Sequence, residues 1–422
     1  MRITIHRGID QIGGCITEIE SVDGTRILID LGHNLPQGEV EEYDSLDKSE
    51  DLETLLKGVS HIFYSHYHSD HIGFESKVPD SVQQHLGSLS LKMLRVLRKH
   101  MSYAPSLRDE AYKSLLALER FNKYKSYKRE IYGGIAITPL PVSHSAIDAH
   151  MFFIECDGKT VLHTGDFRDH GYNGKELLQN VFSYISHPVD VLITEGTLLG
   201  RNDLRMITEY QLKEKAKLCF KKYNFVLCSS MDIDRLTSFI TASQEQNPQR
   251  RIIADRYQIE QIMLIRQKFN KPYSDIFAYP YGRDWKKELY RMHKYGFLMF
   301  VRCSDSFVKY IDEIMKVMDV NPNDIAFFYS MFSGYIDKKH KAYRASLYNF
   351  VNRYSWKLEY LHTSGHASKD TLREICSMAN PNYAIIPIHK EGKGNMGILG
   401  LKTNCPIIEE TTTIKDIEIF IK

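Results

Sequence analysis

The stretch SHYHSDHIG, residues 65–73, constrains this 422-residue chain more than any other part of it. It places His66, His68, Asp70 and His71 within six positions, although the chain holds only 18 histidines in total. Protonated imidazoles repel one another, and a buried carboxylate needs a partner. A divalent cation meets both demands, because it binds neutral imidazole nitrogen and anionic oxygen. The spacing H-x-H-x-D-H therefore indicates a metal-binding loop, although a histidine taken alone is more often an ordinary core or surface residue.

The spacing also predicts how this loop divides its ligands. His66 and His68 are two residues apart, so on an extended segment they point the same way. Asp70 and His71 follow in a turn that ends at Gly73 and can reach a second position. Because the preceding letters HIFYSH are typical of a buried strand, the loop follows a strand's carboxyl end, where α/β proteins place their sites.

Composition limits the class of protein. A chain of 422 residues predicts two domains or one domain with a large insertion, and 43% hydrophobic with 26% charged residues is ordinary for a globular protein. The net charge of +2 means that attraction to a polyanion must come from local patches. We expect neither a signal peptide nor a membrane span. Seven scattered cysteines without a CxxC predict reduced thiols, a cytoplasmic location and no thiolate zinc site.

The sequence pattern changes along the chain. Alternating and short apolar runs predict strands in the first thirty residues, and periodic leucines predict helix over 80–130. From about residue 201, apolar runs such as NFVLCSS and GFLMFVRC alternate with helical stretches at 205–222 and 234–246, which predicts a parallel sheet of its own. We therefore expect a first α/β domain that begins at 1–200, an inserted domain at 201–355, and a return to the first domain at 356–422, with a helix over 368–379.

Three later stretches supply further ligand-type residues. His144 in PVSHS, Asp166 in HTGDF and His389 in IPIHKEG each come just past a predicted strand. Singly, each could cap a loop or form a turn. Together with the opening cluster they predict a two-metal site, because a carboxylate can bridge cations about 3.5–4 Å apart. The predicted ligands of one metal are His66, His68 and His144, those of the other are Asp70, His71 and His389, and Asp166 bridges the two.

These residues carry a resemblance to a known family. The motif HxHxDH, followed by His144, Asp166 and His389 and preceded by LIDLG with Asp30, resembles the metallo-β-lactamase superfamily. ITEGT with Glu195, HTSGHAS with His366, and PIH with His389 resemble the three extra motifs of its β-CASP branch. That branch comprises nucleic-acid nucleases such as RNase J and the pre-mRNA 3′-end endonuclease. The resemblance implies an α/β fold, a metallo-β-lactamase αββα sandwich with an inserted α/β β-CASP domain at about 201–355.

The resemblance also implies a reaction. Two Zn²⁺ ions, or Mn²⁺, which accepts similar ligands, would bring the pKa of a bound water towards about 7 and provide a hydroxide that attacks phosphorus. His366 would protonate the leaving 3′ oxygen, with Glu195 orienting it, and Asp70 completes the expected catalytic set. In the family, a histidine at the last motif accompanies RNA-cleaving members, so His389 favours RNA. We therefore expect a zinc-dependent ribonuclease, endo and/or 5′-exo, that acts on single-stranded RNA in processing or decay. The resemblance also allows a homodimer.

Substrate contacts are less sharply marked. Short Ser/Gly loops after predicted strands offer hydroxyl and backbone N–H groups to phosphate, although ordinary turns have the same composition. The candidates are Ser230, Ser333, Ser364 and Ser368. The stretch ERFNKYKSYKRE, residues 119–130, interleaves basic and aromatic residues as single-stranded nucleic acid sites do, but its aromatics could equally form the core face of a helix.

Two other functions remain open at the level of sequence. One is a metallo-β-lactamase-fold hydrolase of another substrate, such as DNA, a small ester or a small phosphodiester, but such enzymes usually lack a large insertion ahead of an SGH motif. The other is an inactive RNA-binding complex subunit. Inactive members usually lose ligands, and none is missing here.

Overall fold

The structure is a computed structural model that describes residues 1–35, 46, 49–185, 187–201, 206–281, 288–391, 394–409 and 417–420. The chain forms two compact units. Unit 1 comprises Met1–Leu35, Tyr43–Arg205 and Gly365–Lys422, and unit 2 comprises Met206–Ser364 among the described residues. The domain bounds expected from sequence, 1–200, 201–355 and 356–422, stay a prediction beside these units.

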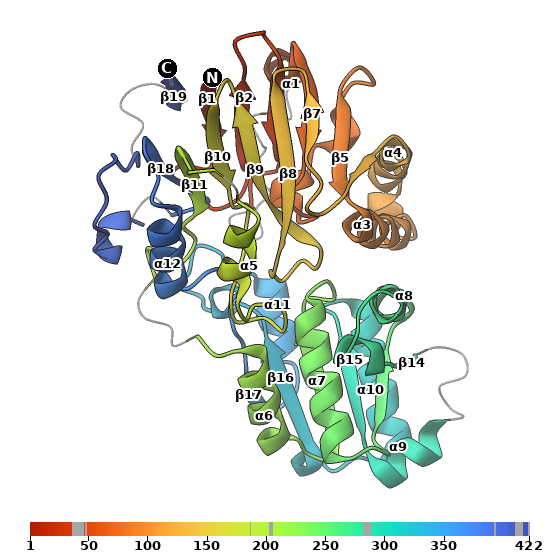
Figure 1. The fold of residues 1–422 in the computed structure, drawn as a ribbon. Coiled ribbons are helices and arrows are strands. Elements are labelled where there is room, and N and C mark those ends of the chain that lie inside the picture. The colour runs from red at the N-terminus through yellow and green to blue at the C-terminus, as the bar shows by residue number, and fades with distance from the viewer. Residues whose placement is uncertain are drawn as a thin grey trace. The chain divides into compact units, whose positions relative to one another are not determined.

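Two mixed sheets build unit 1 (Figure 1). The first has the order β19 (Ile417–Phe420), β1 (Arg2–Arg7), β2 (Ile16–Glu20), β3 (Arg26–Ile29), β4 (Val59–Phe63), β5 (Gln83–Gly87) and β6 (Asn122–Tyr124). The second has the order β18 (Ala384–Ile388), β11 (Val191–Glu195), β10 (Lys159–His163), β9 (Ala149–Cys156), β8 (Ile135–Val142) and β7 (Glu130–Tyr132).

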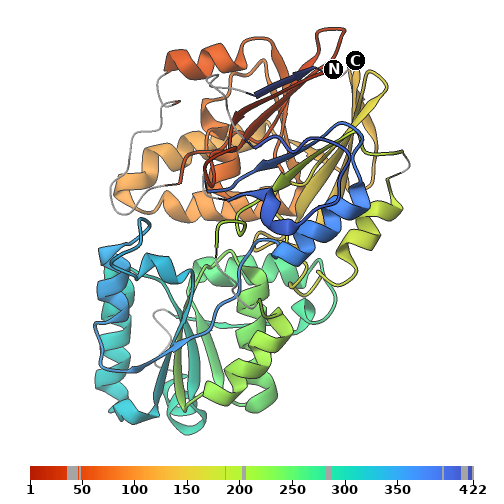
Figure 2. The same ribbon diagram turned by 90° about the vertical axis from the view of Figure 1, so that its left-hand side faces the viewer.

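The sheets of unit 1 pack face to face, with helices outside them. Alternate side chains of both sheets, such as Ile3, Ile19 and Ile154, share one buried core between the sheets. The opposite face of the second sheet packs on α5 and α12 in another core. Figure 2 shows these two helices on one side of the strands and α3 and α4 on the other. The helices of unit 1 are α1 (Ser49–Leu56), α2 (Ser69–Ile72), α3 (Ser88–Met101), α4 (Arg108–Glu119), α5 (Leu177–Ser183) and α12 (Lys369–Ala379). This is the predicted αββα sandwich.

Strand direction brings the ends of several strands to one edge. Strands β10, β11 and β18 run parallel, with Val161 opposite Val191 and Glu195 opposite Ile388. Their carboxyl ends therefore meet, and the residues that follow them come close together although the sequence separates β10 from β18 by more than two hundred positions. Strand β4 of the first sheet ends at Phe63, just ahead of the loop 65–73. It therefore brings that loop to the same edge.

One expectation for unit 1 is wrong in part. The stretch 80–130 is helical only in α3 and α4, because it opens with β5 and continues after α4 with β6. Both strands are short parallel members of the first sheet, and β5 is buried over four of its five residues. A short strand buried on both faces has no alternating pattern that would distinguish it from a helix segment.

Unit 2 contains one parallel sheet, as the alternation of strands and helices predicts. Its order is β14 (Tyr279–Pro280), β13 (Arg251–Ala254), β15 (Phe297–Val301), β12 (Tyr223–Cys228), β16 (Ile325–Ser330) and β17 (Lys357–Tyr360). Its helices are α6 (Glu209–Cys219), α7 (Ile233–Gln246), α8 (Arg256–Arg266), α9 (Leu289–Tyr295), α10 (Asp305–Met318) and α11 (Ala345–Val351). Within the described residues, no helix of the chain is long and apolar enough to cross a membrane.

Candidate metal centre

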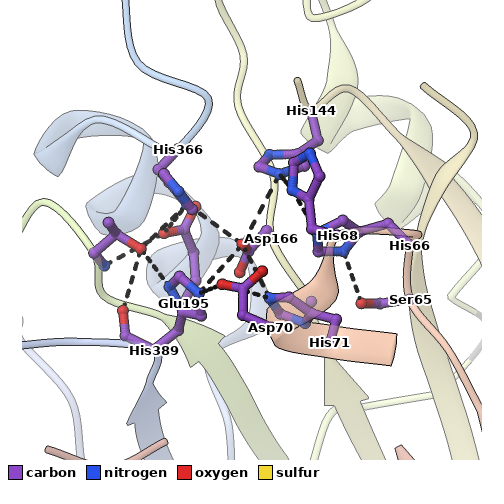
Figure 3. A network of polar contacts seen from close by, with 12 residues as sticks. Ser65, His66, His68, Asp70, His71, His144, Asp166, Glu195, His366 and His389 are labelled. Carbon is purple, nitrogen blue, oxygen red and sulfur yellow. Dashed lines mark hydrogen bonds and ion pairs between the residues drawn. The ribbon is translucent and has the colours of Figure 1, made fainter. Parts of the chain in front are cut away.

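A triad of histidines forms the first ligand cluster, and all three come from loops that follow strands. His66 Nε2 lies 3.0 Å from His68 Nδ1, and His144 Nε2 lies 3.2 Å from the same atom. One ring nitrogen of each residue falls within 4.8 Å of the others. Figure 3 shows the three rings turned toward one another. The structure thus brings together the three residues predicted to hold one metal.

Hydrogen bonds behind the triad orient two of its rings. His66 Nδ1 lies 3.0 Å from Ser65 Oγ, whose own proton goes to Asp30 Oδ2 at 2.8 Å. His144 Nδ1 donates to the backbone oxygen of Gly365 at 2.6 Å. With Nδ1 engaged in both residues, Nε2 faces the centre. A hydrogen bond to one ring nitrogen of a metal-binding histidine directs the other nitrogen to the metal in this way.

Burial keeps the triad neutral. It lowers the pKa of His66 and His144 well below the usual value, and neighbouring histidines add to that effect. Burial likewise lowers the pKa of His68 to about 4. Neutral imidazole is the form that a cation binds, so the triad is in its ligand form at neutral pH.

A second cluster pairs imidazoles with carboxylates. His389 Nε2 lies 3.2 Å from Asp70 Oδ2, and His71 Nε2 lies 3.2 Å from Asp166 Oδ2. Burial opposes the charge of Asp70, but nearby His71 and His389 outweigh it and hold the pKa of that carboxyl below its usual range. Burial also opposes the charge of His71, but Asp166, Asp30 and Asp70 outweigh it and raise the pKa of His71 well above its usual value.

Asp30 anchors this cluster from the end of β3. Its carboxylate accepts hydrogen bonds from Ser65 N at 2.7 Å and from His71 Nδ1 at 2.8 Å. Asp30 is fully buried and its backbone is left-handed, with φ of 62°. A carboxylate that holds Nδ1 of a histidine leaves Nε2 as the ligand atom, so Asp30 braces the loop 65–73 and orients His71.

Asp166 faces both clusters. Its Oδ2 lies 3.9 Å from His144 Nε2 in the triad and 3.6 Å from His389 Nε2 in the second cluster. Its Oδ1 is buried and, among the described residues, has no hydrogen-bond partner. A buried carboxylate oxygen without a donor is costly unless a cation meets it. The donor set of neutral imidazoles and carboxylates therefore fits two divalent cations, with Asp166 between them.

A glutamate–histidine pair lies beside the second cluster (Figure 3). Glu195 ends β11, is fully buried, and accepts hydrogen bonds from the backbone N–H of Ala367 at 2.9 Å and of Thr197 at 3.3 Å. His366 Nδ1 lies 3.2 Å from Glu195 Oε2 and 3.6 Å from Asp166 Oδ2. Burial opposes the charge of His366, but these two carboxylates outweigh it and raise its pKa.

Comparison with known proteins gives a consistent result. Residues 25–225 match the family described as the beta-lactamase superfamily domain. This match covers a little under half of the chain, and it agrees with the predicted resemblance to the metallo-β-lactamase superfamily. Its similarity to a probable RNase MJ4 of Methanocaldococcus jannaschii is 24% identity over 92% of each protein. Its similarity to ribonuclease J of Helicobacter pylori is 22% identity over 93% of this chain and 56% of that protein, so the chain spans little more than half of ribonuclease J.

A solved structure supports the fold of this chain. A protein of unknown function from Enterococcus faecalis V583 superimposes with a TM-score of 0.71 at 18% identity, over 99% of both chains. Together with the family match, it confirms the predicted fold class over both units.

Sequence reasoning missed two residues at this centre. Thr197 Oγ1 lies 2.7 Å from His389 Nδ1 and 3.1 Å from His366 Nδ1. Cys15 Sγ falls within 4.8 Å of a ring nitrogen of His71 and of His389, and burial raises the pKa of its thiol. Thr197 is two residues from Glu195 in the ITEGT motif, which is a signal that could have found it. Cys15 has no such signal, since it lies on a loop far away in sequence.

Two glycines allow the loop 65–73 to approach the first sheet. A Cβ on Gly32 would lie 1.7 Å from the backbone oxygen of Asp70. A Cβ on Gly13, whose φ is +81°, would lie 2.9 Å from Asp70 Cβ. Only glycine fits where backbone must come this close, so these positions set the place of Asp70.

The predicted substrate residues are divided between the units. Ser368 belongs to unit 1, where its hydroxyl accepts a hydrogen bond from Thr371 N and caps α12. The other three belong to unit 2. There the hydroxyl of Ser230 accepts a hydrogen bond from Gln258 Nε2 at 3.0 Å, and Ser333 is exposed. A shared phosphate site for the four serines stays a prediction.

The basic and aromatic stretch 119–130 does not form the helix considered for it. Helix α4 ends at Glu119, and β6 follows. Phe121 and Tyr124 are buried, which agrees with a core role for those rings, whereas Tyr127 is 42% exposed and stacks on Tyr184 at 4.0 Å.

Proposed function

We propose that this chain is a metal-dependent ribonuclease that hydrolyses phosphodiester bonds of single-stranded RNA. The observation that carries the proposal is that Asp166 Oδ2 lies within 4 Å of a nitrogen of the triad, of the second cluster and of His366. Two-metal phosphodiester hydrolysis needs two metal positions and a proton donor close together. Here all three would surround the carboxylate of Asp166. The printed names of the relatives, RNase MJ4 and ribonuclease J, support RNA as the substrate.

The distances support the proposed ligand sets. His66, His68 and His144 would hold one cation, Asp70, His71 and His389 the other, and Asp166 would bridge them. Two bound divalent cations would supply an activated water and neutralise the charge that grows on the phosphate oxygens. We propose Zn²⁺ as the resident metal because neutral imidazole nitrogens predominate in the set, and Mn²⁺ as the competitor that accepts the same ligands.

The chain's own contribution to bond cleavage is a proton. His366 turns Nδ1 toward Glu195 and Asp166, and these carboxylates favour the imidazolium form. Its second ring proton, on Nε2, is the one that would pass to the leaving 3′ oxygen. Glu195 is fixed by backbone N–H groups from two segments, so it orients His366 without moving itself.

Unit 2 supports assignment to the β-CASP branch. Its parallel α/β sheet separates Glu195 from His366 in the sequence, as the inserted domain of that branch does. The branch resemblance and His389 together favour RNA over DNA, a small ester or a small phosphodiester.

One gel experiment tests the proposal. Metal-stripped protein is reloaded with Zn²⁺ or Mn²⁺ and incubated with a 5′-labelled single-stranded RNA and with DNA of the same sequence, each beside a chelator control. We expect metal-dependent cleavage of RNA, with product sizes that separate internal from 5′-terminal action. The Asp70→Ala protein should lose turnover by a factor of at least about 100, since losing a ligand should exceed the effect of losing an outer partner.

A matched control separates ligand loss from general damage. Asp169 is an aspartate three residues beyond Asp166 that pairs with His170 at 3.3 Å, and Asp169→Ala should retain cleavage. Metal-loaded protein that leaves RNA intact but cleaves DNA or a small diester would overturn the substrate class. Binding of RNA without cleavage under either metal would favour an inactive RNA-binding subunit.

A further inference from the structure

Thr197 lies in the β11–α6 connection and contacts Glu195, His366 and the predicted metal ligand His389. Its backbone N–H donates to Glu195 Oε2 at 3.3 Å. Its hydroxyl lies 3.1 Å from His366 Nδ1 and 2.7 Å from His389 Nδ1. The same hydroxyl donates to the backbone oxygen of His389 at 3.1 Å. Thr197 is 2% exposed, so water does not compete for these bonds.

The donors and acceptors around this hydroxyl can be counted. A threonine hydroxyl has one proton and can accept two hydrogen bonds. The backbone oxygen of His389 can only accept, so it takes the single proton of Thr197. His389 Nδ1 must then donate to Thr197 Oγ1 and therefore carries a proton. His366 Nδ1 faces Thr197 Oγ1 and the carboxylate of Glu195, which can only accept, so it carries a proton that these two acceptors share.

This count has a consequence for both histidines. With a proton on Nδ1, neutral His389 presents a lone pair at Nε2, the atom that lies 3.2 Å from Asp70 and 3.6 Å from Asp166. His366, with Nδ1 directed at Thr197 and Glu195, keeps Nε2 as its outward-facing nitrogen. One side chain thus fixes the ring orientation of a predicted ligand and of the predicted proton donor.

We propose that Thr197 is a positioning residue that couples His389 to His366 and fixes the Nδ1–H form of both rings. The proposal rests on the proposed function only for the role of His366, because the effect on metal binding through His389 is independent of the substrate. Thr197 acts by holding the two rings, as outer partners of metal-binding histidines do.

Two substitutions of Thr197 distinguish the effect of its hydroxyl group from the effect of its side-chain shape. Thr197→Val keeps the branched shape and removes the hydroxyl, which takes the Oγ1 acceptor from the Nδ1–H of His389 and leaves His366 Nδ1 with Glu195 alone. Thr197→Ser keeps the hydroxyl. The matched control is Thr194→Val, because Thr194 is equally buried on β11 and, among the residues that the structure describes, its hydroxyl donates only to the backbone oxygen of Glu195, at 3.4 Å.

The first readout is metal affinity, which needs no substrate. Metal-stripped proteins are titrated with Zn²⁺ and with Co²⁺, whose visible absorption reports the ligand geometry. We expect Thr197→Val to weaken binding of one of the two ions by about 10–100-fold and to alter its Co²⁺ spectrum. We expect Thr197→Ser to stay within about threefold of the unchanged protein and Thr194→Val to match it.

The second readout is kinetic. At saturating metal, Thr197→Val should lower kcat for RNA about 10–100-fold with KM changed less than about twofold, because Thr197 orients reacting groups and does not bind substrate. Thr197→Ser should recover most of kcat. Equal metal binding by Thr197→Val and the unchanged protein, or failure of Thr197→Ser to recover either readout, would overturn the proposal.

A measurement on the unchanged protein does not depend on whether a variant folds. Nitrogen-15 spectra of the metal-loaded, histidine-labelled protein report which ring nitrogen carries the proton, and we expect Nδ1–H on His389 and a proton on Nδ1 of His366. A proton on Nε2 alone in either ring would contradict the proposal. If RNA is not cleaved while the metal and proton results hold, the proposed function fails and the positioning role of Thr197 stands.

Discussion

The two ligand clusters of this centre differ in whether they contain side chains of opposite charge. The triad of His66, His68 and His144 contains only imidazoles, and burial lowers the pKa of each. The second cluster sets Asp70 and Asp166 against His71 and His389 at 3.2–3.6 Å, so it compensates much of its charge internally. The nitrogen lone pairs of the triad therefore need a cation as their partner. The second cluster already pairs imidazoles with carboxylates, so its charges attract one another before any cation binds.

The largest expected effect comes from removing the carboxylate that the clusters share. Asp166→Ala takes away the bridge, so we expect loss of at least one metal equivalent and a fall in RNA cleavage of about 1,000-fold or more, beyond the 10–100-fold typical of outer partners. Metal content by emission spectroscopy and single-turnover cleavage measure both. Asp169→Ala is the control, and an Asp166→Ala protein that keeps two metals would remove the basis for treating the clusters as one centre.

Because the clusters differ in this way, two alanine variants of the metal-stripped protein should lose different amounts of unfolding free energy. His71→Ala leaves Asp30 and Asp166 buried without their shared imidazole, which should cost about 3–5 kcal/mol of unfolding free energy. His68→Ala removes a neutral ring among neutral rings and should cost about 2 kcal/mol less. Urea unfolding at pH 7 measures both. Equal losses would mean that the two clusters do not differ in internal compensation.

A smaller effect is expected from the hydroxyl behind the triad. Ser65 Oγ joins His66 Nδ1 to Asp30 Oδ2, so Ser65→Ala should weaken the metal held by the triad about tenfold and leave the other nearly unchanged. Competitive titration with a chromophoric chelator resolves the two affinities. Equal weakening of both sites would show that Asp30, which Ser65 also contacts, transmits the change to His71.

The smallest effect concerns a histidine pair outside the centre. His85 Nε2 lies 3.0 Å from His61 Nδ1, and burial lowers the pKa of His85 to about 3. A histidine whose pKa is depressed by folding contributes stability fully above its unfolded pKa of about 6.5, and that stability declines as the pH falls below it. His85→Phe, which preserves stacking on Phe63 at 4.3 Å, should therefore flatten the loss of stability between about pH 6.5 and 4. Unfolding midpoints across that range measure it, and an unchanged slope would assign the acid sensitivity to the triad instead.

Much of the candidate centre was predictable, because the residue types and their spacing are visible in short stretches of the sequence. Four of the seven predicted ligands lie within the six positions 66–71, and the other three each follow an apolar run, which marks a strand end. Glu195 and His366 were predictable only through the branch resemblance, since a glutamate at a strand end has many ordinary roles. Thr197 and Cys15 were not predicted, because a hydroxyl or a thiol gains its meaning here from neighbours far away in sequence.

Less of the local fold was predictable where burial hides periodicity. The βα alternation of unit 2 and the helix α12 agree with the sequence pattern, because their apolar positions repeat with a clear period. The short parallel strands β5 and β6 were missed within a stretch that otherwise is helical. Their pairing is decided by the strands beside them, and no local signal in the sequence marks it.

The sequence by itself determined the donor types, their order along the chain and the two-domain pattern, because side-chain chemistry and periodicity are local properties. Only the tertiary structure decided that Asp166 faces both clusters, that Thr197 joins His366 to His389, and that Gly32 lets Asp70 approach the first sheet. Those facts depend on distances between segments that are in some cases more than two hundred residues apart. Such distances are set by strand pairing and core packing, which no single segment encodes.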